Sequence, residues 1–552
     1  MSFPSAIHSK VDSAAVTKVT RLFNNTIGDV LAELIQNARR AGATVVRLQA
    51  SETGDRPWLT IADNGNGISD PSVVLALGRS DWDSDVVRRE DPAGMGVFSL
   101  AGRRMIIRSR PSTALTGWQV DIPSGAWESG TPVAVAAFDG TVGTEIGFAL
   151  DGPWAIALDN AARAAARHCP LLVVLNGEEL KREDWLAGAA AIFEEDGVRI
   201  GVFDDRRSNH VSHSVNFHGV TVSGRFDTIA EKDFQWCARV NIVDAPELQL
   251  VLPARKEMVE NDALTRLRLN VRRAVYRHIA SRTGHSLSFE RWTEAANLGV
   301  VLPEARPVLT AWEPASADID TGVTRSHLSS GAQPIIVEYF CPAIGQSACL
   351  ALVRDQRFDG RLAAADTQME GYGWYDRLAR ITDLSFEIGR EGRTVTYCET
   401  VFHGLDSGVV DRLDLIVTLN GQGGAAIRIP APVFVDYDEG SCWNVEEANI
   451  LLASPEAVTP EDLVDLLDGI CFSSSDDRDA DSWETQHDRF LLDAREIAVR
   501  ALQGDDAATL ERLRAVLARR VQWFVPDGRQ FRAVISRDGL QLDIEPAPPR
   551  SD

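Results

Sequence analysis

Residues 28–42 read GDVLAELIQNARRAG, and residues 58–68 read WLTIADNGNGI. In the first stretch Glu33 and Asn37 are four residues apart, so on a helix they project from one face. The opposite face is apolar, and Gly42 is placed to end the helix; the apolar positions are Ile27, Val30, Leu31, Leu34, Ile35 and Ala38. A carboxylate beside an amide makes a poor core, because burying either without a partner is costly. The pair predicts a site for a hydrated metal ion and an activated water.

The second stretch predicts a buried strand over residues 58–62 that ends at Asp63. Gly65 and Gly67 follow, and glycines there let the backbone turn and approach a ligand closely. Asp63 would then accept hydrogen bonds from an exocyclic amine, as adenine presents. Alone, this acid-glycine pattern is typical of a solvated turn. Its spacing after the ELIQNA helix favours a nucleotide site.

Two further segments complete the set. Residues 91–100 read DPAGMGVFSL, a glycine-rich entry into an apolar helix. Free N–H groups at a helix start bind anions, and small residues let phosphate oxygens reach them. Residues 143–148 read GTEIGF, a strand whose Thr144 is placed to support the base-binding acid.

These four blocks, in this order, resemble the N-terminal ATPase domain of the GHKL superfamily. That superfamily includes gyrase B subunits, heat-shock-ninety chaperones, sensor histidine kinases and MutL, and the MORC proteins are similar. No Walker-type GxxxxGK[ST] sequence competes with these blocks. The resemblance implies an α+β protein that begins with a Bergerat α/β sandwich and binds ATP and Mg²⁺.

The resemblance also implies a role for each matching residue. Asn37 matches the magnesium ligand, and Glu33 matches the acid that polarises the attacking water. Histidine kinases usually carry Asn at the position of Glu33, so Glu33 favours a hydrolase. Asp63 matches the adenine-binding acid. The remaining implied nucleotide contacts are Gly65, Gly67, Ile68, Gly94, Met95, Gly96, Val97 and Thr144.

The chain departs from the superfamily pattern at two positions. Many relatives read N-A-x-D-A at the helix end, and here Arg40 replaces the acid. Several relatives place a lysine where Trp82 stands, near the start of a charged lid over about 78–96. Both changes bear on lid chemistry and nucleotide affinity, and neither touches Glu33, Asn37 or Asp63.

A second region resembles the transducer domain of chaperone, MutL and topoisomerase relatives. A strand runs into an Asn-Gly turn at residues 171–178, and residues 250–258 read LVLPARKEM before an arginine-rich helix over about 262–282. The resemblance implies a basic residue that reaches the γ-phosphate: Lys256 is the first candidate and Arg255 the second. The helix arginines 266, 268, 272, 273 and 277 either contact phosphates or pair with nearby acids on a solvated face.

At 552 residues the chain predicts about three domains. The predicted division is an ATP-binding domain (1–150), a transducer-like α/β domain (151–300), a linker (301–333), a β-rich domain (334–440) and a helical region ending in a β-hairpin (441–552). Strand-like runs in the β-rich part include CLALVR at 349–354, and GQGG at 421–424 predicts a hairpin turn. Residues 301–552 resemble no family.

Charge is unevenly distributed. Residues 1–300 contain 33 basic and 37 acidic side chains, whereas residues 301–552 contain 23 and 43, so the acidity lies in the C-terminal part. A broad basic DNA-binding surface is not expected there. The chain has no run of eighteen apolar residues and no N-terminal signal core, and its seven cysteines are scattered. These features predict a cytoplasmic protein with reduced thiols and no membrane segment.

The leading hypothesis is an ATP-hydrolysing conformational machine, chaperone-like or MORC-like. Nucleotide would close the lid and join two N-terminal domains in a homodimer, and the acidic C-terminal region would act on a protein partner. A histidine-kinase-type phosphotransferase is one alternative, against which Glu33 argues. A DNA-directed clamp resembling MutL or a topoisomerase B subunit is another, which the arginine helix supports. A non-hydrolysing ATP-dependent switch is the fourth.

Overall fold

The computed structural model describes residues 26–53, 56–75, 97–126, 131–204, 214–232, 235–251, 257–318, 333–398, 405–420, 426–437, 444–475 and 480–547. The chain divides into two compact units, Met1–Ala305 and Arg306–Asp552, which are described separately. Within the described ranges, no helix is both long and apolar enough to cross a membrane.

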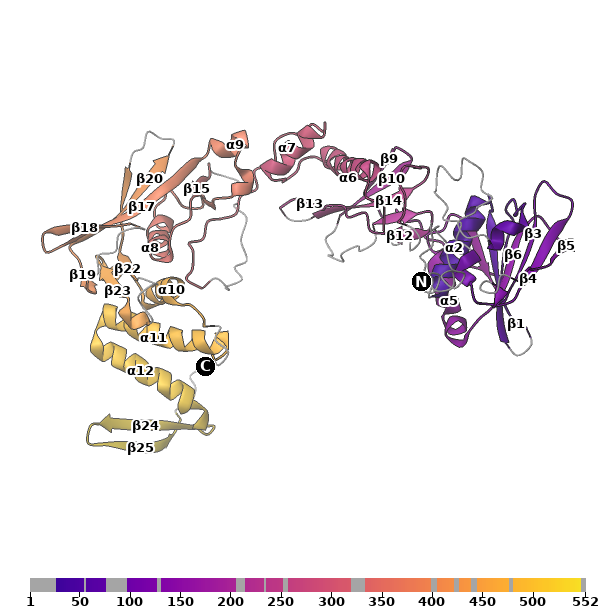
Figure 1. Ribbon diagram of the computed structural model, residues 1–552. Helices are drawn as coiled ribbons and strands as arrows, with labels where there is room; N and C mark the ends of the chain where they lie inside the picture. Colours follow the sequence, from indigo (N-terminus) through magenta and orange to yellow (C-terminus); the bar gives the residue numbers. More distant parts are fainter. Residues whose placement is uncertain are drawn as a thin grey trace, which may run out of the picture. The chain divides into compact units, whose positions relative to one another are not determined.

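Helix α2 (Ile27–Arg40) opens the described part of the first unit. Its N-cap is Thr26, whose hydroxyl accepts a hydrogen bond from the backbone N–H of Asp29 at 3.2 Å. The six apolar residues predicted to share one face are all buried. Helix α5 (Gly152–Ala166) packs against α2, and Figure 1 shows both helices on the same side of the first sheet.

The first sheet has eight strands in the order β5-β4-β3-β6-β2-β1-β7-β8. Strand β2 (Arg56–Asp63) pairs antiparallel with both β1 (Val45–Thr53) and β6 (Gly143–Ala149), and this register sets Asp63 opposite Thr144. Beyond β6 the sheet continues through β3 (Met105–Arg110) and β4 (Gly117–Ile122) to the edge strand β5 (Val135–Phe138). Short 3₁₀ turns η1 (Pro71–Leu75) and η2 (Val97–Leu100) lie in the connection between β2 and β3.

Strand β7 (Leu172–Leu175) continues this sheet by pairing parallel to β1, and a tight hairpin leads to β8 (Glu178–Glu179). Asn176 and Gly177 form the hairpin turn with φ of 50° and 88°, the left-handed conformation that a two-residue loop requires. The first sheet therefore contains strands from both sides of residue 150, where the sequence predicts a domain boundary. The domain boundaries proposed from the sequence stay a prediction.

A second sheet in the same unit has the order β12-β11-β14-β10-β9, with β13 also paired to β14. Helices α6 (Asp262–Ala280) and α7 (Phe289–Asn297) follow it, and the apolar side of α6 is buried in the core of this sheet. The strands are β9 (Ala191–Glu195), β10 (Val198–Asp204), β11 (Val215–Phe217), β12 (Val220–Val222), β13 (Ile229–Ala230) and β14 (Gln235–Ile242).

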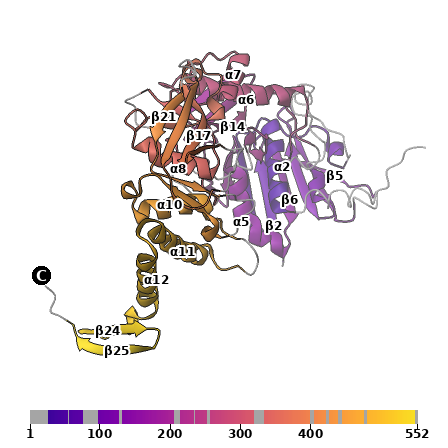
Figure 2. The same cartoon turned by 90° about the vertical axis from the view of Figure 1, so that its left-hand side faces the viewer.

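The second unit combines a mixed sheet, a three-stranded sheet and helices. The mixed sheet contains β15 (Ile335–Val337), β16 (Leu362–Ala364), β17 (Ala379–Arg390), β18 (Arg393–Tyr397), β20 (Arg412–Asn420) and β21 (Ala426–Pro430), and the smaller sheet contains β19 (Gly408–Val409), β22 (Val433–Asp436) and β23 (Asn449–Leu452). The helices are α8 (Pro342–Val353), α9 (Gly373–Asp376), α10 (Pro460–Cys471), α11 (Trp483–Gln503) and α12 (Asp505–Arg520). A hairpin of β24 (Arg529–Ser536) and β25 (Gly539–Pro546) follows α12 (Figure 2).

The predicted α+β class is confirmed, with one error in the second unit. The CLALVR run was expected to be a strand, and it forms the end of helix α8. Ala348, Ala351 and Leu352 are buried at helical spacing, so a short apolar run was misassigned because its length suits either element. The GQGG turn lies outside the described residues, although the strands on either side of it pair antiparallel.

Leu31 on α2 is fully buried in the core of the first unit. We expect Leu31→Ala to lower the free energy of unfolding of this unit by about 2–5 kcal/mol, because the lost methyl groups leave a cavity. Leu115→Ala is the matched control, since Leu115 is 92% exposed, and it should change this free energy by less than about 0.5 kcal/mol. Urea titration followed by tryptophan fluorescence measures both, and equal effects would contradict the packing described.

Candidate functional site

Glu33 and Asn37 lie on the side of α2 that is not packed into the core. Both are half-buried, while the buried residues of α2 face the other way. The spacing of one helical turn places the carboxylate and the amide on a single face. Both offer hard oxygen atoms, which suit a magnesium ion that keeps most of its waters. The residues present therefore fit the metal that the resemblance implies.

Arg40 contacts the candidate metal ligand directly. Its Nη1 donates a hydrogen bond of 2.9 Å to Asn37 Oδ1, in a partly buried environment. Many relatives carry an acid at this position. In this protein a permanently charged guanidinium lies next to the amide oxygen instead. The sequence showed the substitution, and the structure shows which atom it reaches.

Asp63 ends β2 with its carboxylate held by backbone. Oδ1 accepts a hydrogen bond of 2.8 Å from the N–H of Gly65, and the N–H of Thr144 also donates to the carboxylate. The residue as a whole is half-buried, but its carboxyl group is shielded from water, and this burial raises the pKa of Asp63 above its ordinary value. The two backbone hydrogen bonds oppose part of that rise. A shielded carboxylate of this kind is suited to accept from an amine of a ligand.

Ser109 on β3 lies beside Thr144 and is not among the site residues predicted from the sequence. Its fully buried hydroxyl donates to the carbonyl oxygen of Gly143 at 3.1 Å and lies 3.0 Å from the hydroxyl of Thr144. It also accepts from the N–H of Ile68 at 2.8 Å. Ser109 thus joins two predicted site residues, Thr144 and Ile68. The sequence does contain one indication of its burial: Ser109 alternates with the apolar residues Met105 and Ile107 on the same face of the strand.

The glycines near Asp63 are required by packing against protein backbone. A Cβ on Gly65 would lie 2.7 Å from the Cβ of Ala41. Gly67 has a φ of 73°, and a Cβ there would lie 2.4 Å from the carbonyl oxygen of Arg110. From the sequence these glycines are expected to let the backbone turn and approach a ligand closely, and the ligand contact stays a prediction. The structure adds a packing role, because their lack of a Cβ lets the turn pack against the end of α2 and the end of β3.

Several predicted site residues lie outside the described residues. They are Gly94, Met95, Gly96, Arg255 and Lys256, together with Trp82 and the lid over 78–96. Val97 is described and begins η2, where it is half-buried.

The described residues on either side of Arg255 and Lys256 contact each other. The N–H of Val251 donates to the carbonyl oxygen of Glu257 at 2.8 Å, and Leu250 forms a bridge with Met258. Glu257 also forms a bridge with Ser223, just after β12. Residues 251 and 257, which flank the segment with Arg255 and Lys256, are therefore hydrogen-bonded to each other.

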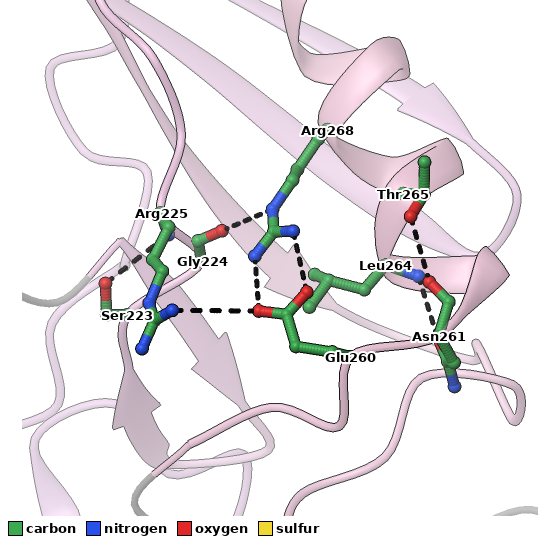
Figure 3. Close-up of polar contacts among 8 residues, drawn as sticks. All are labelled: Ser223, Gly224, Arg225, Glu260, Asn261, Leu264, Thr265 and Arg268. Carbon is green, nitrogen blue, oxygen red and sulfur yellow. Dashed lines mark hydrogen bonds and ion pairs between the residues drawn. The ribbon is translucent and has the colours of Figure 1, made fainter.

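Glu260 holds the segment that leaves this loop (Figure 3). Its carboxylate accepts two hydrogen bonds of 2.8 Å from Arg268 on α6, and Arg225 lies 4.0 Å away. The hydrogen bonds from Arg268 hold the pKa of the Glu260 carboxyl below its ordinary value. Arg268 Nε also donates to the carbonyl oxygen of Gly224, so the same guanidinium ties α6, the loop exit and the end of β12 together.

Gln36 joins α2 to the second sheet. Its side chain is 4% exposed, and Nε2 donates to the carbonyl oxygens of Phe217 at 3.2 Å and His218 at 3.0 Å. These carbonyls belong to the last residue of β11 and to the first residue of the turn that leads to β12. A glutamine between the two candidate site residues of α2 thus connects their helix to the sheet that carries the Lys256 loop. Gln36 is not among the residues predicted from the sequence, because a single polar residue on an apolar helix face does not reveal its partner.

All five arginines of the α6 stripe have acidic partners. Arg268 pairs with Glu260 and Arg266 with Glu247. The other pairs are Arg272 with Asp227 and Glu294, Arg273 with Glu195, and Arg277 with Glu195. The pairing supports the interpretation of this stripe as a solvated face and weakens its interpretation as a phosphate-binding surface.

Comparison with known proteins gives one sequence relative. No protein-family model matches the chain. Over 125 residues the chain is 34% identical to the DNA mismatch repair protein MutL of Trichlorobacter lovleyi, which covers 21% of this chain. The chain spans about a fifth of the length of that relative (20%).

Two solved structures show lower similarity. The ATPase and transducer domains of DNA topoisomerase II from Balamuthia mandrillaris are 15% identical, with a TM-score of 0.29, and the match covers 36% of this chain and 61% of that one. The MutL ATPase domain of Aquifex aeolicus, complexed with ADP, is 18% identical, with a TM-score of 0.24, and the match covers 39% and 92%. The sequence match to MutL confirms the resemblance to the GHKL ATPases that the motifs of the first unit indicate.

Proposed function

We propose that this protein is a magnesium-dependent ATPase that uses ATP to drive a change of conformation. The observation that supports this most is the shielded Asp63 carboxylate, held by two backbone N–H groups at the end of β2. In this proposal the carboxylate accepts a hydrogen bond from the adenine amine. The similarity to MutL supports the same assignment.

Hydrolysis would depend on helix α2. Glu33 would accept hydrogen bonds from the attacking water and orient it, while Asn37 would hold Mg²⁺ through its amide oxygen. When bound, the metal would offset charge on the phosphate oxygens. Lys256, or Arg255 in its place, would approach the γ-phosphate from the second sheet and stabilise the charge that develops in the transition state.

A continuous set of contacts would link the two halves of this site. Gln36 binds the β11–β12 turn, β12 leads to Ser223, and Ser223 forms a bridge with Glu257 at the base of the Lys256 loop. A movement of α2 on nucleotide binding would thereby shift the base of that loop. This arrangement gives the ATPase region a physical route to the second sheet.

What the ATP is used for is also part of the proposal. We infer that lid closure joins two copies of the chain through their N-terminal regions, and that the acidic region after residue 300 binds a cytoplasmic protein partner. The uneven charge supports a partner with a basic surface. Different affinities of the open and closed states for that partner would perform the work.

A second candidate function is a DNA-directed clamp. The similarity to a DNA mismatch repair protein favours it, whereas the paired α6 arginines and the acidic C-terminal part oppose it. If it is correct, DNA accelerates phosphate release, and this acceleration falls steeply as salt rises. No acceleration at low salt would exclude it.

Glu33→Ala should abolish most phosphate release, by about 10²–10⁴-fold, because the attacking water loses its base. The affinity for a non-hydrolysable ATP analogue should stay within about threefold, as measured by calorimetry. Glu179→Ala removes an exposed acid from β8 and serves as the control. Equal rates for wild type and Glu33→Ala would remove Glu33 from the mechanism.

Asp63→Asn should weaken ATP binding by about 10–100-fold, because a hydrogen bond to a charged acceptor contributes roughly 1.5–3 kcal/mol. The same change should not destabilise the nucleotide-free protein at neutral pH. Since burial raises the pKa of Asp63 above its unfolded value, the folded protein binds more protons, and stability falls as pH rises from about 4 through the folded pKa.

The asparagine variant lacks this penalty, so its urea midpoint at pH 7 should equal or exceed that of wild type. A lower midpoint together with unchanged ATP affinity would show that Asp63 serves structure alone.

Gln36→Ala should lower the hydrolysis rate about tenfold and change ATP affinity by less than about threefold. The physical reason is that one buried and one partly buried carbonyl lose their donor, at a cost of about 1–2 kcal/mol. Gln49→Ala on β1 is the control, because the amide of Gln49 is exposed. If both variants hydrolyse ATP at the wild-type rate, the contact between α2 and the second sheet does not contribute to hydrolysis.

A further inference from the structure

Arg40 contacts the same oxygen atom of Asn37 that would coordinate magnesium. Asn37 Oδ1 is the oxygen that would coordinate the metal, and Arg40 Nη1 donates to it at 2.9 Å. Asn37 and Arg40 are three residues apart on α2, so the helix itself keeps the guanidinium near the amide. The contact is partly buried, which strengthens it relative to a solvent-exposed pair.

The chemistry of the two cations makes this contact a competition. A guanidinium stays charged at all physiological pH values, so Arg40 cannot relieve the conflict by losing a proton. Two positive charges on one amide oxygen repel each other, and a neutral amide carries no charge to offset them. Magnesium also needs near-octahedral geometry, which a donor already placed against the oxygen disturbs.

We propose that Arg40 is a specificity-determining residue that competes with Mg²⁺ for Asn37 Oδ1. Arg40 occupies the oxygen in the nucleotide-free protein, and loading of Mg²⁺ with ATP displaces it. The protein therefore needs a higher magnesium concentration for nucleotide binding than the same site without the arginine. This inference rests on the proposed ATP site.

The test measures the magnesium concentration that gives half-maximal binding of a non-hydrolysable ATP analogue to the full chain by calorimetry. Arg40→Ala should lower this concentration about tenfold or more, in line with the loss of a charge-assisted hydrogen bond. Arg40→Asp, which restores the acid of many relatives, should lower it at least as far. Arg47→Ala removes the same charge from an exposed position on β1 and should leave it within about twofold.

A double-mutant cycle assigns the effect to the shared oxygen. In an Asn37→Ala background, Arg40→Ala should no longer shift the half-maximal magnesium concentration. An equal shift in both backgrounds, or no shift in either, overturns the competition. If wild type and Arg40→Ala both fail to bind the analogue at any magnesium concentration, the proposed ATP site itself is wrong. Binding with unchanged magnesium dependence rejects only the role of Arg40.

Discussion

The candidate site is organised around the Asp63 carboxylate, which accepts a hydrogen bond of 2.8 Å from the N–H of Gly65 in the turn after β2. The antiparallel register between β2 and β6 sets Asp63 opposite Thr144, whose backbone also favours the charged carboxylate. Because Gly65 also packs against Ala41, the same turn contacts the end of helix α2. One desolvated carboxylate thus connects the strand, the turn and the helix that carries Glu33 and Asn37.

The free-energy cost of burying the charged Asp63 carboxylate is the reason to expect a ligand beside it. Burial opposes the charged form of Asp63, and the two backbone hydrogen bonds compensate only in part, so its pKa stays raised. A buried acid that is not fully compensated is uncommon in a purely structural corner. An amine-bearing ligand would complete the hydrogen bonding, and adenine presents such an amine at one edge.

Local sequence patterns were sufficient for the elements that depend on neighbours along the chain. The apolar face of α2 and the Asn176–Gly177 hairpin follow from helical periodicity and from left-handed turn chemistry, and both appear as expected. Gln36 and Ser109 could not be predicted, because each bonds to backbone brought close by the tertiary fold. The packing role of Gly65 and Gly67 was missed for the same reason. The strand predicted for CLALVR (349–354) was wrong because a short apolar segment fits a helix as well as a strand.

The central claim is that the Asp63 carboxylate accepts a hydrogen bond from the exocyclic amine of adenine and thereby selects ATP. Calorimetric titration of the full chain with ATP and with GTP, at saturating Mg²⁺, tests it most directly. Adenine presents an amine to the carboxylate, whereas guanine presents a carbonyl oxygen at the equivalent position, and two acceptors facing each other repel. The account predicts that ATP binds at least about 100-fold more tightly than GTP, from roughly 3 kcal/mol of lost and unfavourable hydrogen bonding. Equal binding of the two nucleotides, or binding of neither, would contradict it.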